Sequence, residues 1–342
     1  MRANWWKFLS VFLIFFSLIA GLYFPLSTSI VSVSPASVHP GENTINIKAY
    51  NANFEDKNLM VWLENSGKKY CTTNVQVIDK NNISATVNLP SVSQNLFFDA
   101  NISSEKEGNL IFTNAFSGTN FVANGKDSSK INDCNIVTFN NKLAGISFPN
   151  QPILNETIRN LYFHVPFWFS MMAIMFYSFI ASIQFLSKGN VNNHYKALEA
   201  SKVGLFFCVL GLLSGSVWAR FTWGAWWIGD PRLNGAAITF LIYLAYYILQ
   251  ASISDKIKAA RVSAVYNIFA FCLLILFLMV LPRMSDSLHP GVGGNPGFSK
   301  YDLDSSMRMV FYPAVLGWIL FAFWLYNLKY RISLLMVKNE ND

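Results

Sequence analysis

Residues 201–252 read SKVGLFFCVLGLLSGSVWARFTWGAWWIGDPRLNGAAITFLIYLAYYILQAS. Two apolar runs in this stretch flank a short tryptophan segment, Trp223–Leu233, in which three indole side chains fall within five residues. Each flanking run approaches the roughly 20 apolar residues that a bilayer span requires. The tryptophan segment is too charged for a span and too aromatic for an ordinary loop. The stretch therefore predicts two membrane helices joined by an aromatic loop suited to binding a ligand.

Similar apolar runs recur along the whole chain, which is 53% hydrophobic and 13% charged. We expect six spans, at residues 6–26, 165–186, 201–219, 235–252, 263–282 and 309–327. The sequence thus predicts a polytopic α-helical membrane protein. The first run could instead be a cleavable signal peptide, because Arg2 and Lys7 precede its apolar core. Its length, and the lack of a clean small-x-small cleavage site after it, favour an uncleaved anchor.

The basic residues orient these spans, because short segments rich in Lys and Arg stay on the cytoplasmic side. The inner segments contain Arg2, Lys7, Lys188, Lys196, Lys202, Lys256, Lys258, Arg261, Lys329, Arg331 and Lys338. The outer short loops contain only Arg220, Arg232, Arg283, Lys300 and Arg308. Both termini are therefore expected in the cytoplasm, with the tryptophan segment outside. The net charge of +7 is dispersed among the spans, so a nucleic-acid partner is not expected.

Between the first two spans, residues 28–155 change to Asn, Ser and Thr alternating with apolar residues, which indicates strands separated by polar turns. The expected strands are Thr44–Ala49, Leu59–Glu64, Asn74–Asp79, Ser84–Leu89, Asn109–Phe116 and Asn135–Asn140. We expect an inserted all-β, immunoglobulin-like extracytoplasmic domain, although a partly open barrel would give the same pattern. Its expected role is docking.

The cysteines are few and carry no redox or covalent-heme motif, since no CxxC or CxxCH occurs. Cys71 and Cys134 lie in the outer domain, where an exported compartment permits a disulfide. The alternative is two buried free thiols. Cys208 and Cys272 fall in predicted spans, where we expect them to pack as small apolar side chains.

The tryptophan segment could hold a large planar ligand such as heme. Trp223, Trp226 and Trp227 offer flat aromatic faces, and Arg220 and Arg232 flank them as donors to carboxylates. The alternative is an interfacial tryptophan belt with no ligand, with both arginines facing lipid phosphate.

Two of the four histidines strengthen the ligand interpretation. His164 and His289 each sit at the edge of an apolar run, on the outer side with the tryptophan segment, and two imidazoles can ligate heme iron axially. We expect Pro166 in the first turn of a helix that mounts His164, and a mobile Gly/Pro loop around His289. The alternatives are an interfacial imidazole bonded to a carbonyl and an incidental histidine in a connector. His39 and His194 are expected to be plain solvated residues.

Residues 156–331 resemble the heme-handling membrane protein of bacterial cytochrome c maturation system I, the CcmC-like, WWD-domain family. The resemblance consists of the Arg-x-x-Tyr-x-His-Val-Pro pattern at Arg159–Pro166, the tryptophan segment, and Leu288-His289. It implies a heme b site with His164 and His289 as iron ligands, and with Trp223, Trp226, Trp227 and Asp230 holding the porphyrin. It also implies a periplasmic heme chaperone and ABC-type transporter subunits as partners, in a bacterial inner membrane, without catalysis by the chain itself.

The chain departs from the family pattern at two places. Gly229 stands where the family usually has a further Trp before its Asp, and the domain at 28–155 replaces a short loop. The expected organisation is a first transmembrane helix at 1–27, a periplasmic domain at 28–155, a five-helix heme-handling core at 156–331 and a cytoplasmic tail at 332–342.

Two other functions fit parts of the sequence. A system II-type cytochrome c synthase component shares the tryptophan segment, but its usual members carry a histidine pair within the membrane, and no predicted span here contains a histidine. A sensor or adhesion receptor would bind its ligand with the outer domain and use the spans as an anchor.

Overall fold

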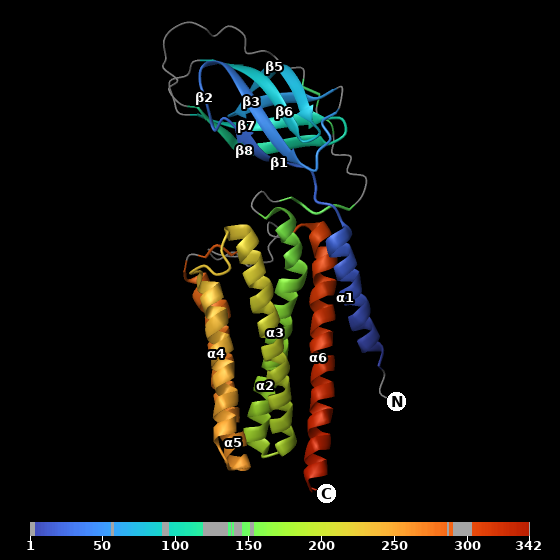
Figure 1. The fold of residues 1–342 in the computed structure, drawn as a ribbon, viewed down its shortest axis with the longest axis vertical. Helices are drawn as coiled ribbons and strands as arrows, with labels where there is room; N and C mark the ends of the chain where they lie inside the picture. The colour runs from blue at the N-terminus through green and yellow to red at the C-terminus, as the bar shows by residue number, and fades with distance from the viewer. Residues whose placement is uncertain are drawn as a thin grey trace. The chain divides into compact units, whose positions relative to one another are not determined.

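The computed structural model describes residues 4–55, 58–90, 96–118, 136–137, 139, 146–150, 154–285, 287–289 and 303–341. The chain divides into two compact units (Figure 1). The helical unit comprises Met1–Phe24 and Glu156–Asp342, and the β unit comprises Pro25–Asn155.

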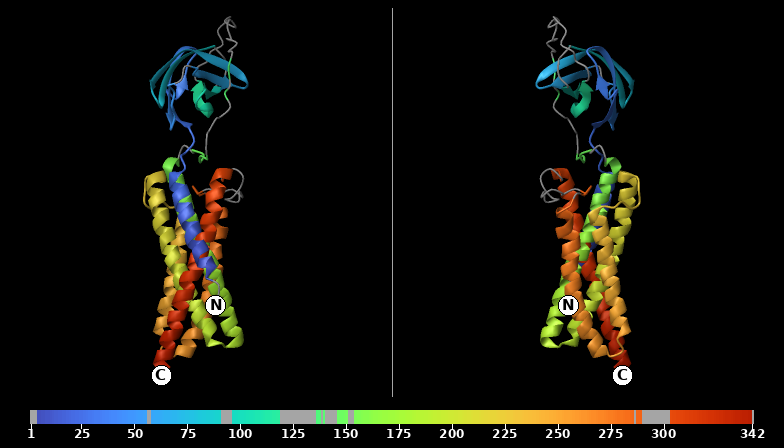
Figure 2. Two further views of the ribbon diagram at one scale, coloured as in Figure 1. Left: turned by 90° about the vertical axis from the view of Figure 1, so that its right-hand side faces the viewer. Right: turned by 90° about the vertical axis from the view of Figure 1, so that its left-hand side faces the viewer.

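The helical unit contains α1 (Trp5–Tyr23), α2 (Leu161–Lys188), α3 (Val191–Trp223), α4 (Pro231–Ser252), α5 (Lys256–Ile275) and α6 (Ser305–Asn341). Among the described residues, six helices are long and apolar enough to cross a membrane. The predicted six-span membrane protein is confirmed. Figures 1 and 2 show these helices as one bundle with roughly aligned axes.

The first helix packs against the last one at a glycine. The Ser10 hydroxyl donates to the carbonyl of Gly317 over 2.9 Å. A Cβ at Gly317 would lie 2.9 Å from the Cβ of Leu13, so the missing side chain permits this approach. The contact explains how α1 joins the bundle although the β unit separates it from α2 in sequence.

The structure corrects two sequence-based expectations about histidines. The Asn190 side chain accepts from the Asn192 N–H and caps α3, so this helix begins at Val191, ten residues before the predicted span. His194 therefore lies on α3 and is buried, with its ring centroid 5.5 Å from that of Phe185, and it is not a solvated loop residue. Likewise α2 begins upstream of His164. His164 and His194 thus lie on helices, outside the apolar ranges 165–186 and 201–219 that the sequence predicted as spans.

The end of the fifth helix is irregular. After α5 the chain makes a π-helical turn, η2 (Leu276–Val280), and a 3₁₀ turn, η3 (Leu281–Arg283). A Cβ added at Gly235 of α4 would overlap the carbonyl oxygen of Phe277. Backbone therefore meets backbone here, next to the segment that leads to His289.

The β unit contains β1 (Ser29–Ser34), β2 (Ser37–Val38), β3 (Gly41–Tyr50), β4 (Met60–Asn65), β5 (Lys68–Asp79), β6 (Asn82–Leu89), β7 (Leu96–Ser104) and β8 (Gly108–Gly118). They pair in the order β1-β3-β6-β5-β4-β7-β8-β2, antiparallel except for β2 with β8. The inserted all-β domain is confirmed. Since β5 pairs with both β4 and β6, the strands form one curled series, as in the partly open barrel considered above.

Alternation explains the strands that the sequence predicted. In β3 the side chains of Ile45, Ile47 and Ala49 are buried while their neighbours are exposed. Strands β1, β2 and β7 were not expected. Three of the six residues of β1 are serines, β2 has two residues, and β7 places Asp99 and Asn101 among its apolar residues. Of the predicted strand at 135–140, residues 136, 137 and 139 lie outside any strand, and the others lie outside the described residues.

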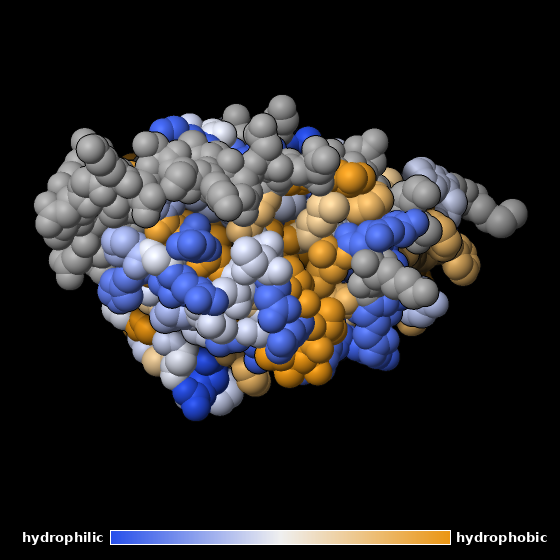
Figure 3. Space-filling view, turned by 90° about the horizontal axis from the view of Figure 1, so that it is seen from above, coloured by the Kyte–Doolittle hydropathy of each residue, from blue (hydrophilic) through white to orange (hydrophobic). Residues whose placement is uncertain are grey.

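The cysteines are divided between the two units. Cys71 on β5 is bonded in a disulfide, while Cys134 lies outside the described residues, so their pairing stays a prediction. Cys208 is buried in the helical core, as expected, whereas Cys272 is exposed on the surface of α5. Seen from above, hydrophilic and hydrophobic side chains both reach the surface (Figure 3). Phe97 and Ile111 are exposed hydrophobic residues of the β unit.

Candidate functional site

His164 lies near the start of α2 and is buried, with 9% of its surface exposed. Its Nδ1 is 3.0 Å from the Ser214 hydroxyl on α3. Ser214 has one hydroxyl proton, and this proton is donated to the carbonyl of Leu210 at 2.8 Å or Gly211 at 3.1 Å. With that proton directed at a helix carbonyl, the Ser214 oxygen accepts from Nδ1–H. This tautomer leaves the Nε2 lone pair of His164 free to bind a metal.

The surroundings of His164 are aromatic and tight. The rings of Trp168 and Trp218 meet the imidazole edge to face, with centroids at 6.2 Å and 5.7 Å. Trp218 Nε1 donates to the Thr157 hydroxyl over 3.2 Å, which fixes that indole. A Cβ at Gly215 would lie 2.7 Å from Cε1 of His164. The imidazole therefore has little freedom to turn.

His289 lies in the segment between η3 and α6 and contacts Asp230. Its Nδ1 is 3.1 Å from Oδ1 of that carboxylate, so Nδ1–H donates and Nε2 is again the free nitrogen. The Asp230 carboxylate also accepts from the Ser287 hydroxyl at 2.8 Å and from the Leu288 N–H at 2.9 Å. It caps α4 as well, accepting from the Arg232 N–H at 2.8 Å. One side chain thus joins the start of α4 to the histidine segment.

The predicted mobility of the Gly/Pro loop around His289 stays a prediction. The described residues 287–289 are tied to Asp230, and the Gly/Pro residues that suggested motion, 290–297, lie outside the described residues. The structure thus gives His289 a defined mounting.

The electrostatics of this cluster favour a neutral histidine beside a charged aspartate. Burial lowers the pKa of His289 below its ordinary value of 6.5, and the nearby Arg232 acts in the same direction, against the Asp230 carboxylate. Burial raises the pKa of Asp230. The hydrogen bonds from Ser287, Leu288 and Arg232 together lower it by more than burial raises it, so the pKa lies below its ordinary value. A neutral imidazole is the form that ligates a metal.

The three tryptophans of the segment differ in their surroundings: Trp223 packs against His289, whereas Trp226 and Trp227 are exposed. Trp223 meets the His289 ring edge to face, with centroids 5.0 Å apart. Trp226 and Trp227 are 58% and 46% exposed, and Trp227 Nε1 donates to the Asn234 side chain over 3.2 Å. The exposed pair offers apolar faces to a ligand, while Trp223 belongs to the packing of the histidine.

The two arginines differ in their surroundings. Arg220 is exposed, and its guanidinium donates to the carbonyl of Gly224, a residue in the left-handed conformation at the end of α3. Arg232 is partly buried beside Asp230 and His289. Arg232 is therefore part of the His289 cluster, whereas Arg220 closes the end of a helix.

The other residues of the Arg-x-x-Tyr-x-His pattern have structural contacts. Arg159 donates to the carbonyls of Gly21 and Phe24 at 2.8 Å and 2.7 Å, at the end of α1. Tyr162 is buried, and its ring packs against Gly21. A Cβ added at Gly21 would lie 2.9 Å from Cδ2 of Tyr162. The pattern therefore anchors α1 as well as mounting His164. Pro166 falls in the second turn of α2, because the helix begins at Leu161 and not after the histidine.

The structure brings the predicted residues into two clusters. His164 stands with Ser214 and Trp218, and His289 with Asp230, Trp223 and Arg232. The two imidazoles are near enough to interact electrostatically. Sequence reasoning missed Ser214, Trp218 and Ser287. The only available signal was small polar or aromatic residues close to the predicted ligands, which is too common to be specific.

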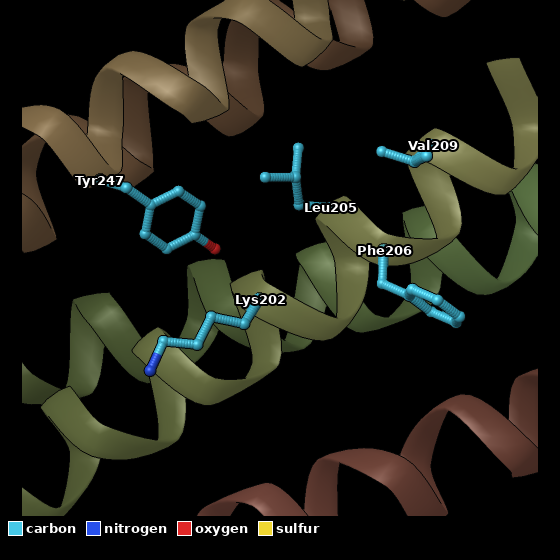
Figure 4. A pocket seen from close by; sticks show the side chains of 5 residues that line it. All are labelled: Lys202, Leu205, Phe206, Val209 and Tyr247. Carbon is cyan, nitrogen blue, oxygen red and sulfur yellow. The ribbon is translucent and has the colours of Figure 1, made fainter.

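A separate groove of about 360 Å³ contains none of the predicted site residues. It is lined by Lys202, Leu205, Phe206 and Val209 of α3 and by Tyr247 of α4 (Figure 4). Tyr247 reaches toward α3, where its hydroxyl donates to Ser201 over 2.9 Å.

Comparison with known proteins identifies the helical unit. The family model described as "Heme exporter protein C" matches residues 134–342. The heme exporter protein C of Haemophilus influenzae is 25% identical over 199 residues, which is 56% of this chain and 77% of that protein. The one from Bradyrhizobium diazoefficiens is 36% identical over 121 residues, 35% of this chain and 46% of that protein.

A shorter likeness reaches a second kind of protein. The cytochrome c biogenesis protein CcsA of Prochlorococcus marinus is 38% identical over 77 residues, 22% of this chain and 24% of that protein. The family model covers more than half of this chain, including both histidines and the tryptophan segment. With six membrane helices and this match, the chain belongs to the heme exporter protein C family.

Proposed function

We propose that this chain binds heme b at the outer face of the bacterial cytoplasmic membrane and presents it to a periplasmic heme chaperone. Heme handling in cytochrome c biogenesis is the function of its family and of the relatives described above. The chain is a multi-pass membrane protein and, through its family, part of a heme export system. Beyond the function of the family, we propose which residues ligate the heme iron, on which side of the membrane the heme lies, and which protein receives it.

The single observation that carries the proposal is that both histidines use Nδ1 for a hydrogen bond within the protein. Nδ1 of His164 faces Ser214 and Nδ1 of His289 faces Asp230, so in both imidazoles Nε2 is the nitrogen left for a metal. This is the arrangement that axial ligation of heme iron requires.

The remaining groups fit the rest of the heme molecule. Trp226 and Trp227 expose apolar faces that can cover a porphyrin. Arg232, and more weakly Arg220, supply positive charge for propionates. In this assignment Asp230 does not touch heme but holds His289. Gly229 leaves the aromatic face one ring smaller than is usual in the family.

The proposed orientation is argued from the sequence, and the proposed partners from the family resemblance. The excess of Lys and Arg in the predicted inner segments places both termini in the cytoplasm and residues 28–155 in the periplasm. We assign the chain no catalytic step. ABC-type transporter subunits would supply the energy for releasing the loaded chaperone, since the sequence contains no Walker motif. The β unit would dock a partner.

The test is a visible spectrum of the full chain, purified in detergent after expression with adequate heme. We expect a Soret band that is lost in the double variant His164→Ala, His289→Ala and kept in the matched double variant His39→Ala, His194→Ala. A wild-type protein that neither carries heme nor takes it up on reconstitution would contradict the proposal. So would equal heme loss in both double variants.

A further inference from the structure

The two proposed ligands are held by partners of different charge. Nδ1 of His289 donates to the carboxylate of Asp230 over 3.1 Å, and Nδ1 of His164 donates to the neutral hydroxyl of Ser214 over 3.0 Å. The distances are alike, so the difference between the two bonds is chemical. A hydrogen bond to an ionised acceptor is roughly twice as strong as a neutral one.

The partner of a histidine ligand changes the electron density of the ring. A carboxylate pulls the Nδ1 proton away and makes Nε2 a more basic donor to the metal, whereas a hydroxyl does so far less. The Ser214 hydroxyl also donates back to the carbonyl of Leu210 or Gly211, and its oxygen stays a neutral acceptor.

The carboxylate is itself fixed in place. Ser287, Leu288 and the Arg232 N–H all donate to it, and it is 5% exposed. These bonds draw some charge from Asp230, but they hold its Oδ1 opposite His289 and keep water from replacing it. His289 therefore stays paired with a negative charge, on a segment joined to α4.

We propose that the two iron ligands are unequal: His289, polarised by Asp230, binds heme iron more tightly and keeps it, and His164 is the ligand that gives way first. Asp230 and Ser214 act as positioning residues that set this inequality. The inference rests on the proposed function, because it presumes that both histidines ligate the iron. It assigns an order to heme release, in which a recipient first takes the coordination position of His164.

Single variants test the inequality directly, with the full chain loaded with heme in detergent. We expect His164→Ala to retain heme in a five-coordinate form that binds carbon monoxide when reduced. We expect His289→Ala to lose ~10- to 100-fold more affinity than His164→Ala does. Equal losses, or a larger loss in His164→Ala, overturn the proposal.

The reduction potential tests the role of the carboxylate. A negative charge on the ligand stabilises ferric iron, so Asp230→Asn should raise the midpoint potential of the heme, while Ser214→Ala should leave it near that of the wild type. Ser287→Ala is the matched control, because it weakens the loop contact and keeps the Asp230–His289 pair. A rise in Ser287→Ala as large as that in Asp230→Asn would assign the effect to loop order and overturn the role of charge.

The same preparations separate this inference from the proposed function. A heme-binding wild type with equal ligands contradicts only the inequality. A wild type that takes up no heme contradicts the proposed function itself.

Discussion

The helical unit and the β unit differ in how their sequence relates to function. All eight predicted site residues, from His164 to His289, belong to the helical unit, and the family match covers 134–342. The β unit has its own buried core, built from residues such as Ile47, Val87 and Phe98. A site can thus be specified within one unit while another with a separate core is inserted into the same chain. The comparison predicts that damage to one unit leaves the properties of the other intact.

The largest effect is expected in the core of the β unit. Phe98 is 1% exposed and meets Tyr70 edge to face at 5.7 Å, so Phe98→Ala should destabilise that unit by about 3–5 kcal/mol. Hydrogen exchange of the β strands measures the loss. The Soret band of the same protein should not change. Loss of the Soret band would show that the two units are coupled and would contradict the expectation that damage to one leaves the other intact.

The next effect is expected where α4 meets the π turn. Gly235→Ala places a Cβ against the carbonyl of Phe277, and backbone must move to admit it, at a cost of about 1–3 kcal/mol. Because this turn leads to the His289 segment, we expect reduced heme occupancy in the absorption spectrum. Gly229→Ala is the matched control, since a Cβ there meets nothing within 4 Å. Equal occupancy in the two variants would contradict the coupling of this turn to the site.

A smaller effect is expected beside His164. In Gly215→Ala the new Cβ would lie 2.7 Å from Cε1, too close for a carbon–carbon contact, so the ring must shift and tilt its Nε2. We expect heme affinity to fall by about tenfold, or about 1.4 kcal/mol, with helical content unchanged. Heme titration measures it, and wild-type affinity would show that the ring is free to move.

The smallest effect is a pH dependence confined to the β unit. The side chain of Asn82 and the N–H of Asn81 lower the pKa of Asp79 below its ordinary value of 3.8. The stabilisation is present above pH 3.8 and is lost as the pH falls through the lowered pKa. Protection of the β5–β6 turn against hydrogen exchange, measured relative to the unstructured chain at the same pH, should therefore fall below pH 3.8, and less so in Asp79→Asn. The same pH dependence in both proteins would remove Asp79 as its source.

The helices and most strands could be predicted because their patterns are local. Apolar length located six spans, and alternation located β3, β4, β5, β6 and β8. The helix starts at Leu161 and Val191 could not be predicted from hydropathy, because both helices extend beyond their apolar cores. Asn190 caps α3, and α2 continues from a 3₁₀ turn at Asn155–Asn160.

The site was predicted in part. His164, His289 and the tryptophan segment stand out in the sequence because histidine and tryptophan clusters are rare. Their support does not stand out, because Ser214 is one small residue among many on α3, and only folding places it 3.0 Å from an imidazole fifty positions away. Asp230 was named for contact with the cofactor, and its contacts instead suggest that it acts through His289.

The π turn at Leu276–Val280 determines the rotation, about the helix axis, of the residues that follow it. A π turn contains one residue more than an α turn, and each residue advances an α-helix by about 100°. Deleting one residue from this turn would restore α-helical register and rotate the chain from Leu281 onward by about that angle. Ser287, Leu288 and His289 would then face away from Asp230, although no residue that contacts it had changed. The length of this turn, and not only its composition, is therefore part of what aligns the histidine.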